Sequence, residues 1–147
     1  MMDGLFHIAI VADAIDVAVS IKRTDHPDAG AVNVFVGTTR AETHADGRRL
    51  IRLDYEAYEA LAIKQMNDLA SRATERWPIA RGTIIHRIGP VKVGEPSVLI
   101  AVATPHRRDA FDACQWLIDT LKAEVAIWKQ EIWTDGTATW VHPDARV

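Results

Sequence analysis

A chain of 147 residues is long enough for one domain with a substantial hydrophobic core, and we expect residues 1–147 to form a single domain. Apolar residues make up 48% of the chain and charged residues 25%, a balance that is typical of globular proteins and argues against disorder. The formal net charge of -3 argues against a general nucleic-acid-binding protein, because such proteins usually carry an excess of basic residues.

The single cysteine, Cys114, excludes an internal disulfide and a metal site built from cysteines. It lies among the apolar positions of a predicted helix, which indicates a buried, unreactive thiol. No set of His, Asp and Glu residues has the spacing of metal ligands, and we interpret His86, inside a predicted strand, as structural. The longest apolar run, 98–103, is too short to cross a bilayer, and the first residues lack the features of a secretory signal. We therefore expect a cytoplasmic protein without membrane association.

Short apolar runs in the first half of the chain predict strands over 5–11, 31–37 and 50–58. In the third of these strands the alternation predicts that Ile51 and Leu53 share a buried face.

Two helices are predicted between and after these strands. The first spans 14–22 with Asp13 as its N-cap, and the second spans 57–77 and ends before Pro78. The polar run 41–49 contains glycine and several charges, which predicts a mobile loop.

The second half predicts strands over 83–88 and 97–104, with a turn at 89–90 after the first of them. A hairpin is predicted over 132–141, with the Asp-Gly pair at 135–136 in a type I′ turn. The order of strands and helices, with its predicted hairpins, predicts an α+β fold with mainly antiparallel pairing.

The stretch from 104 to 133 carries the clearest functional pattern. It begins with the cationic pair His106 and Arg107 and continues as an amphipathic helix. Lys122 lies at the margin of the apolar stripe. Lys129 follows seven residues later, so a continued helix would carry both amines on nearly the same side, roughly 10 Å apart along the axis. The apolar stripe comprises Phe111, Cys114, Leu117, Ile118, Leu121 and Val125.

This pattern predicts a site for a small anion. Each lysine taken alone is more typical of an ordinary solvated side chain, because charged residues mostly lie at the surface; the combination with the motifs below favours a site.

Six short segments, in this order and at this spacing, resemble the large, catalytic subunit of molybdopterin synthase. They are Gly-Thr-Thr-Arg at 37–40, Leu-Asp-Tyr-Glu-Ala-Tyr at 53–58, Ile-His-Arg-Ile-Gly at 85–89, Pro-His-Arg at 105–107, Leu-Lys at 121–122 and Ile-Trp-Lys-Gln-Glu at 127–131. The resemblance extends from residue 30 to residue 140. Each segment alone is weak support, whereas six in register identify the family.

The resemblance implies an α/β hammerhead-like α+β fold, with a mainly antiparallel sheet and flanking helices. It implies a homodimer within a heterotetramer, in which each large subunit binds a small ubiquitin-like sulfur-carrier subunit. The Gly-Gly C-terminus of that partner carries a thiocarboxylate. Sulfur transfer converts cyclic pyranopterin monophosphate into molybdopterin, the dithiolene ligand of molybdenum, and the large subunit needs no cofactor and no metal.

Carried over by position, the family's functional residues fall on two lysines and their surroundings. Lys122 and Lys129 are the implied catalytic residues. Lys122 would position the thiocarboxylate and act as general acid or base, with Lys129 as its electrostatic support. The implied substrate-binding residues are Thr38, Thr39, Arg40, His106, Arg107, Gln130 and Glu131.

Three positions depart from the family pattern. Ala126 stands where many members have proline, so we expect the helix to run further here and to place Lys129 differently. Gln130 replaces a frequent second basic residue, which weakens the local positive potential. Pro105 stands where a small residue is more usual, and we expect only a local backbone effect.

Two alternatives remain open at the level of the sequence. One is a Schiff-base lyase that uses Lys122 or Lys129 on a phosphorylated carbonyl substrate, which borohydride trapping would reveal. The other is a non-catalytic module that captures the C-terminal carboxylate of a partner in a basic pocket.

Overall fold

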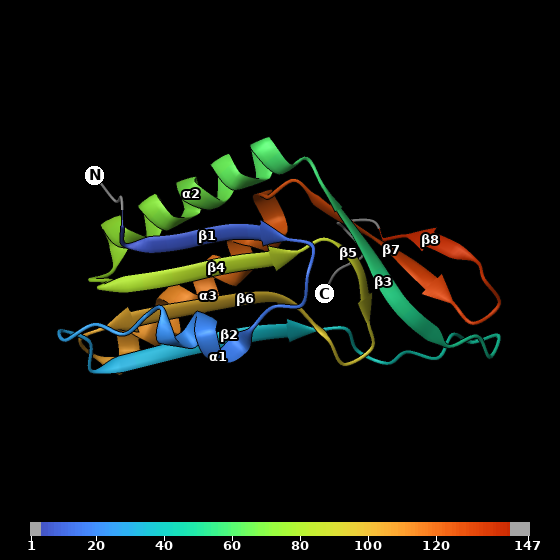
Figure 1. The fold of residues 1–147 in the computed structure, drawn as a ribbon, viewed down its shortest axis with the longest axis horizontal. Coiled ribbons are helices and arrows are strands. Elements are labelled where there is room, and N and C mark those ends of the chain that lie inside the picture. The colour runs from blue at the N-terminus through green and yellow to red at the C-terminus, as the bar shows by residue number, and fades with distance from the viewer. Residues whose placement is uncertain (1–3, 142–147) are drawn as a thin grey trace.

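The structure is a computed structural model that describes residues 4–141. A larger sheet carries helices, and a smaller sheet extends from one end of it (Figure 1). The predicted α+β class with mainly antiparallel pairing is confirmed. In chain order the elements are β1 Phe6–Val11, α1 Val17–Lys22, β2 Ala31–Thr38, β3 Leu50–Ala57, α2 Glu59–Arg76, β4 Arg81–Arg87, β5 Gly89–Lys92, β6 Pro96–Thr104, α3 Arg107–Glu124, β7 Ile127–Trp133 and β8 Ala138–Trp140.

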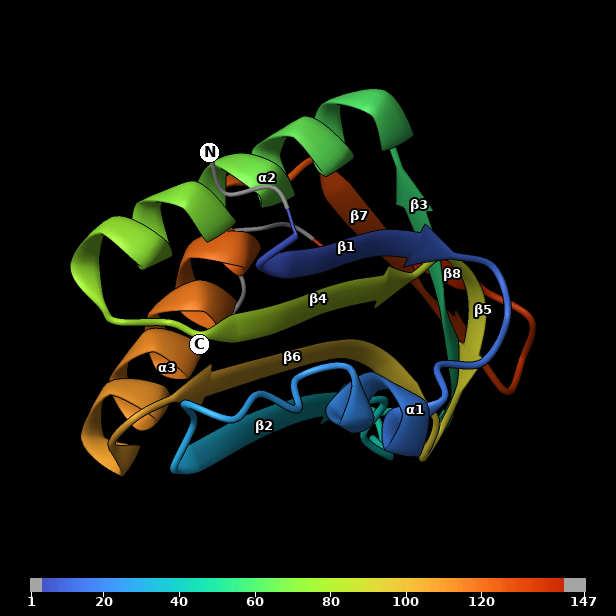
Figure 2. The ribbon, with the colours of Figure 1, turned by 60° about the vertical axis from the view of Figure 1, so that its left-hand side comes forward.

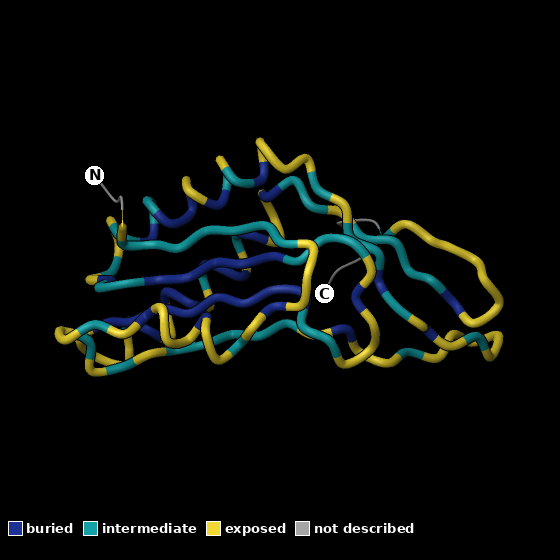
Figure 3. Tube along the Cα trace, in the orientation of Figure 1, coloured by how far each residue is buried: buried dark blue, intermediate teal, exposed yellow. Residues whose placement is uncertain are grey.

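The first sheet has the strand order β1-β4-β6-β2. β1 is parallel to β4, whereas β6 runs antiparallel to both β4 and β2. The helices α2 and α3 cover one face and form the main core with it, and the short α1 packs on the other face (Figure 2). Burial is deepest along β4 and β6, in the middle of this sheet (Figure 3).

The second sheet has the order β5-β3-β7-β8, and all of its neighbouring strands are antiparallel. It begins where β4 ends, because only Ile88 separates β4 from β5. Its core is small and consists of Leu50, Leu53 and Trp133, with Tyr55 packed against them. The two sheets therefore meet at the end of the first sheet where β2 and β4 finish.

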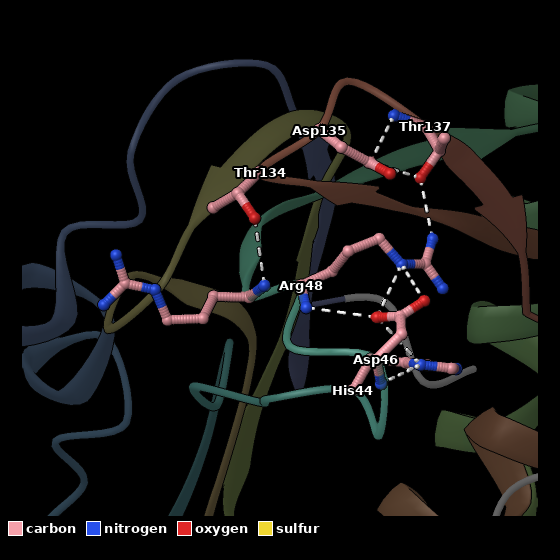
Figure 4. Close-up of polar contacts among 7 residues, drawn as sticks. His44, Asp46, Arg48, Thr134, Asp135 and Thr137 are labelled. Atoms are coloured by element: carbon pink, nitrogen blue, oxygen red, sulfur yellow. Dashed lines mark hydrogen bonds and ion pairs between the residues drawn. The ribbon is translucent and has the colours of Figure 1, made fainter.

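Polar contacts tie the loop 41–49 to the hairpin that joins β7 and β8 (Figure 4). The guanidinium of Arg48 donates hydrogen bonds to the Asp46 carboxylate at 2.8 Å and to the Thr137 hydroxyl at 2.8 Å. The same guanidinium lies 5.1 Å from the ring centre of Trp133, within cation–π range. The loop that the sequence predicts to be mobile thus has specific attachments to the second sheet.

The buried stripe of α3 differs from the prediction at one position. Phe111 is 57% exposed, so its predicted place in the stripe is wrong. Ala110, the residue before it, is buried instead, on the side of the helix that packs on β2 and β6. The residues of α3 that are buried are Ala110, Ala113, Cys114, Leu117, Ile118 and Leu121.

The helix α1 begins three residues later than predicted. Its N-cap is Asp16, whose carboxylate accepts a hydrogen bond of 3.0 Å from the Val19 N–H, and not Asp13. Both aspartates precede apolar residues, and the sequence alone does not distinguish them.

The predicted turn at Gly89 and Pro90 is part of a strand. Both residues belong to β5, which within residues 4–141 pairs only with β3 and forms an edge of the second sheet. An edge strand tolerates proline because its outward side needs no N–H donor.

Ile51, predicted to be buried, is 41% exposed because the pairing register shifts between Leu50 and Arg52.

The turn between β7 and β8 is not of type I′. That turn needs positive φ at both central residues, whereas among residues 4–141 positive φ occurs only at glycines. Gly136 has φ +85° and its N–H donates to the Trp133 carbonyl at 2.9 Å. This is a three-residue loop in which a turn is followed by a glycine in the left-handed region.

Candidate functional site

The two candidate catalytic lysines lie on different elements. Lys122 is in the last turn of α3, which ends at Glu124, and Lys129 is the third residue of β7. The expectation that a continuing helix carries both amines on one side is therefore wrong. So is the expectation that Ala126 lets the helix run further.

The helix ends at this point for reasons that do not require proline. Val125 has extended backbone angles, and its N–H still donates to the Leu121 carbonyl at 3.0 Å. The next N–H, that of Ala126, donates to the side chain of Gln65 on α2 at 2.8 Å. A side chain from the neighbouring helix thus satisfies the backbone where the chain turns into β7.

The topology brings Lys122 and Arg40 to the same end of the first sheet. Only Pro105 and His106 separate β6 from α3, so α3 runs back along β6 and packs on β6 and β2. Its last turn therefore lies where β6 begins and β2 ends. Arg40 follows β2 at that end, and β7 with Lys129 starts from the same region (Figure 1).

The segment after β2 presents one side chain and buries another. The side chain of Arg40 is 84% exposed, and its guanidinium lies 3.4 Å from a carboxylate oxygen of Glu42. Thr38 is exposed. Thr39 is buried, and its hydroxyl donates to the Val91 carbonyl at 3.3 Å, so it links the two sheets and does not offer its side chain to a pocket.

Alternation along β7 separates the three polar candidates. Lys129 and Glu131 share one face of the strand, and Gln130 points to the opposite face. Burial and the nearby Glu42 raise the pKa of Glu131, whereas Lys129 acts in the opposite direction. Lys129, Glu131 and the pair Arg40–Glu42 thus form one connected set of charges.

The sequence interpretation missed a further group beside Lys129. His86, at the end of β4, is buried, and its ring lies 5.0 Å from the ring of Tyr55 in an edge-on arrangement. Tyr55 is the β3 residue opposite Lys129. Burial lowers the pKa of His86 to about 4, and the charge of Lys129 lowers it as well. The imidazole is therefore neutral at pH 7, and its Nδ1–H donates to the Arg87 carbonyl at 2.8 Å.

His86 fits the structural role that its place in a strand predicts, but it is also next to the candidate lysine. Its signal in the sequence is a titratable side chain in a mostly apolar strand core, which does not reveal what lies opposite.

The other basic candidates lie at the opposite end of α3 from Lys122. His106 is the N-cap residue of α3 and Arg107 its first residue, about 22 Å from Lys122 at 1.5 Å per residue. Both side chains are exposed. A hydrogen bond of 3.0 Å from the Gly30 N–H to the Thr104 carbonyl holds their turn beside the start of β2. The backbones approach closely there, because any side chain at position 30 would strike the Pro105 carbonyl. One chain does not bring His106 and Arg107 together with Lys122.

Cys114 is 1% exposed, so the prediction of a buried cysteine is confirmed, and burial raises the pKa of its thiol, which disfavours the reactive thiolate. Within residues 4–141 no three side chains of His, Cys, Asp or Glu are grouped so that they could hold a metal ion. In the same described part of the chain, no helix combines the length and apolar character needed to span a membrane.

The fold and the site define a class of protein: an α+β domain in which the elements that carry Arg40, Lys122 and Lys129 come to the end where two sheets meet. The model of the MoaE protein family matches residues 10–124, and the chain belongs to this family. The molybdopterin synthase catalytic subunit of Halalkalibacterium halodurans is 43% identical over 133 residues, which cover 90% of this chain and 83% of that protein.

Solved structures agree with this assignment. The crystal structure of molybdopterin synthase from Staphylococcus aureus has a TM-score of 0.85 and 37% identity, covering 90% of this chain and 95% of that one. A complex of subunits 1 and 2 of molybdopterin-converting factor from Helicobacter pylori shares the fold, with a TM-score of 0.76, 22% identity and coverage of 91% of this chain and 89% of that one.

The family resemblance drawn from the sequence is confirmed. The activity of this family is that of the catalytic subunit of molybdopterin synthase, a sulfur-transferring enzyme of molybdenum cofactor biosynthesis.

Proposed function

We propose that this chain transfers sulfur from the thiocarboxylated Gly-Gly C-terminus of a small ubiquitin-like subunit to cyclic pyranopterin monophosphate, forming the dithiolene of molybdopterin in the cytoplasm. The complex of two subunits from Helicobacter pylori supports a protein partner. The observation that carries the proposal is the gathering of Arg40, Lys122 and Lys129 at one end of the first sheet, in a chain whose net charge is -3.

The chemistry of the two ligands matches this end of the molecule. A thiocarboxylate and a cyclic phosphate are both anions, and charge-assisted hydrogen bonds from cations bind such groups strongly. Lys122 is the central residue of the proposal. It orients the thiocarboxylate and transfers protons while the thiocarboxylate sulfur attacks the pterin precursor. Lys129 adds positive charge from the facing strand. Because the partner supplies the sulfur, the buried Cys114 needs no chemical role.

A second copy of the chain would place His106 and Arg107 near Lys122, which a single copy does not do. β2 is an edge strand of the first sheet and, within the described residues, pairs only with β6 (Figure 2). The two groups of basic candidate residues lie at opposite ends of this strand. Arg40 follows its last residue, and the turn with His106 and Arg107 lies beside its first residue.

A two-fold axis that pairs β2 with its copy in antiparallel fashion would bring Arg40 of one chain beside the turn with His106 and Arg107 of the other. We therefore propose a homodimer, within a heterotetramer, whose two phosphate-binding sites each take His106 and Arg107 from the partner copy.

Reconstitution tests the activity. Purified chain, a thiocarboxylated small subunit and cyclic pyranopterin monophosphate should give the oxidised dithiolene product by fluorescence detection. Lys122→Ala should lose nearly all turnover, at least about a hundredfold, because it removes a proton-transfer group. Lys122 lies at an exposed helix end, so the change should not disturb folding. Its unfolding curve should match the wild type. Near-normal turnover of Lys122→Ala would refute the role of this residue, and tail binding without product would favour the capture module.

Mixing two inactive variants tests the shared site. If Lys122 and His106 act across the dimer, Lys122→Ala mixed with His106→Ala after dissociation and reassociation should recover about a quarter of wild-type activity, since half of the dimers are mixed and each then has one intact site. If both residues served the same site from one chain, every mixture would stay inactive. Each variant alone, taken through the same treatment, is the control.

A further inference from the structure

A shallow depression of about 560 Å³ lies at the end of the first sheet that is remote from the proposed catalytic lysines. Lys22 and Arg23 reach it from the end of α1, and His7 and Arg81 reach it from the first residues of β1 and β4. Asp25 completes the polar part of its lining. None of the residues assigned to the synthase site lines this depression.

The side chains converge because of the register of the first sheet. Phe6 and Ile84 pack in the core beneath α2 and α3. Strand alternation therefore turns His7, Arg81 and Thr83 to the opposite face, on which α1 lies. Two segments far apart in the sequence thus bring their polar residues to one place.

The charges at this place are unbalanced. Three permanent cations, Lys22, Arg23 and Arg81, face the single carboxylate of Asp25, which leaves a surplus of two positive charges in an acidic protein. Within residues 4–141 none of the three cations makes an ion pair. Burial and the charge of Arg23 lower the pKa of His7, so the field of these cations reaches the neighbouring strand.

A buried polar atom of the lining lacks a partner. The Nε of Arg81 is buried and has no hydrogen-bond partner within residues 4–141. The hydroxyl of Thr83 is also unpartnered within these residues, but Thr83 has no exposed surface and does not line the depression. A buried donor without a partner costs free energy, which a bound acceptor at this position would recover.

We propose that this depression binds a phosphate dianion, either as inorganic phosphate or as the phosphate group of a small ester, at a site separate from the synthase site. The surplus of two positive charges matches the charge of the dianion, and guanidinium groups are well suited to phosphate oxygens. Phosphate binding at this depression requires no residue of the synthase site.

Titration of the full chain by ¹H–¹⁵N NMR tests the proposal. Sodium phosphate, added at constant ionic strength against sodium chloride, should shift the amide signals of His7, Arg23 and Gly82 in a saturable way. The double substitution Lys22→Glu and Arg23→Glu should weaken this binding at least about tenfold, since it reverses two charges at the exposed end of α1. A second titration with glycerol phosphate distinguishes the sources: tighter binding than that of phosphate indicates an ester as ligand, and weaker binding indicates the free ion.

Lys64→Glu is the matched control, because Lys64 is an exposed lysine on α2 that lies outside the depression. It should leave phosphate binding within about twofold of the wild type, since one exposed charge at a distance is screened by salt. The proposal is overturned if phosphate produces no saturable shift, or if Lys64→Glu weakens binding as much as the double substitution. If the double variant does not fold, the single change Arg23→Ala should still weaken binding, and unchanged binding would overturn the proposal.

Discussion

The two sheets of this molecule are held together by different forces. The first sheet is covered on one face by two long helices and on the other by α1, and its strand β6 is buried from Ser97 to Thr104. In the described part of the chain the second sheet carries no helix of its own. It has a small core around Trp133, and ion pairs and ring contacts stabilise its tip. Apolar burial fixes the first sheet, and polar contacts complete the second.

This difference separates the part of the molecule that provides stability from the part that carries the proposed site. The large core defines where β2, β4 and α3 end, and the proposed site residues come from those ends and from the second sheet. A rigid scaffold with polar residues at its rim is the usual arrangement for a functional site. Changes in the first sheet should therefore cost stability, and changes in the second should cost less stability and act closer to the site.

The largest stability loss is expected from Leu117→Ala. Leu117 has no exposed surface and packs between α2 and the first sheet, so truncation leaves a cavity that costs about 3 to 4 kcal/mol of unfolding free energy. Urea unfolding followed by circular dichroism measures the change. Phe111→Ala, on the exposed side of the same helix, should cost less than about 0.5 kcal/mol. Equal losses in the two variants would contradict the assignment of the buried stripe.

The next largest effect concerns His86, where the two sheets meet. The pKa of His86 is about 4 in the folded chain because burial disfavours the imidazolium, against an ordinary value of 6.5. Between pH 6.5 and pH 4 the unfolded chain binds a proton that the folded chain does not. The free energy of unfolding should therefore fall as the pH falls through this window, by up to about 3 kcal/mol.

His86→Gln isolates this contribution, because glutamine does not titrate. Urea midpoints measured at several values between pH 7 and pH 4 should change less steeply for His86→Gln than for the wild type. Asn67→Gln, an exposed change on α2 that removes no titratable group, serves as the comparison and should keep the wild-type slope. A His86→Gln variant with the full wild-type slope would show that other groups cause the acid sensitivity.

Much of the first sheet could be predicted from the sequence, and less of the second. Periodicity identified α2 and α3 and the central strands, because large buried faces leave a strong pattern. The end of α3 was missed because it depends on Gln65 from another helix. β5 was missed because its proline reads as a turn unless the strand is known to lie at an edge.

The candidate site shows the same limit. Local motifs identified Arg40, Lys122 and Lys129 as residues of interest, but sequence spacing could not show that a helix end separates the two lysines. Nor could it show that His106 lies at the far end of the chain's first sheet, since that follows from the direction in which α3 runs back along β6. His86 became visible only through its neighbours in three dimensions.

A smaller effect is expected at the tip of the second sheet. Arg48→Ala removes the contact with the Trp133 ring, the ion pair with Asp46 and the hydrogen bond to Thr137, and should cost about 1 kcal/mol. Part of this loss should disappear in 1 M salt, which screens the ion pair. Arg49→Ala is the matched control, since its side chain is exposed, and it should change stability by less than about 0.5 kcal/mol. Equal effects of both changes would mean that the tip contacts do not stabilise the sheet.

The smallest effect is expected on the lightly covered face of the first sheet, where α1 is the only helix that packs within residues 4–141. Asp16→Ala removes the N-cap of this six-residue helix and should cost about 0.5 to 1 kcal/mol. Asp13→Ala, at the cap position that the sequence predicts, should have almost no effect. Because a short helix depends on its cap and on few tertiary contacts, amide exchange in α1 should quicken in Asp16→Ala while β4 and β6 keep their protection. Loss of protection throughout the first sheet would instead mean that α1 unfolds together with the main core.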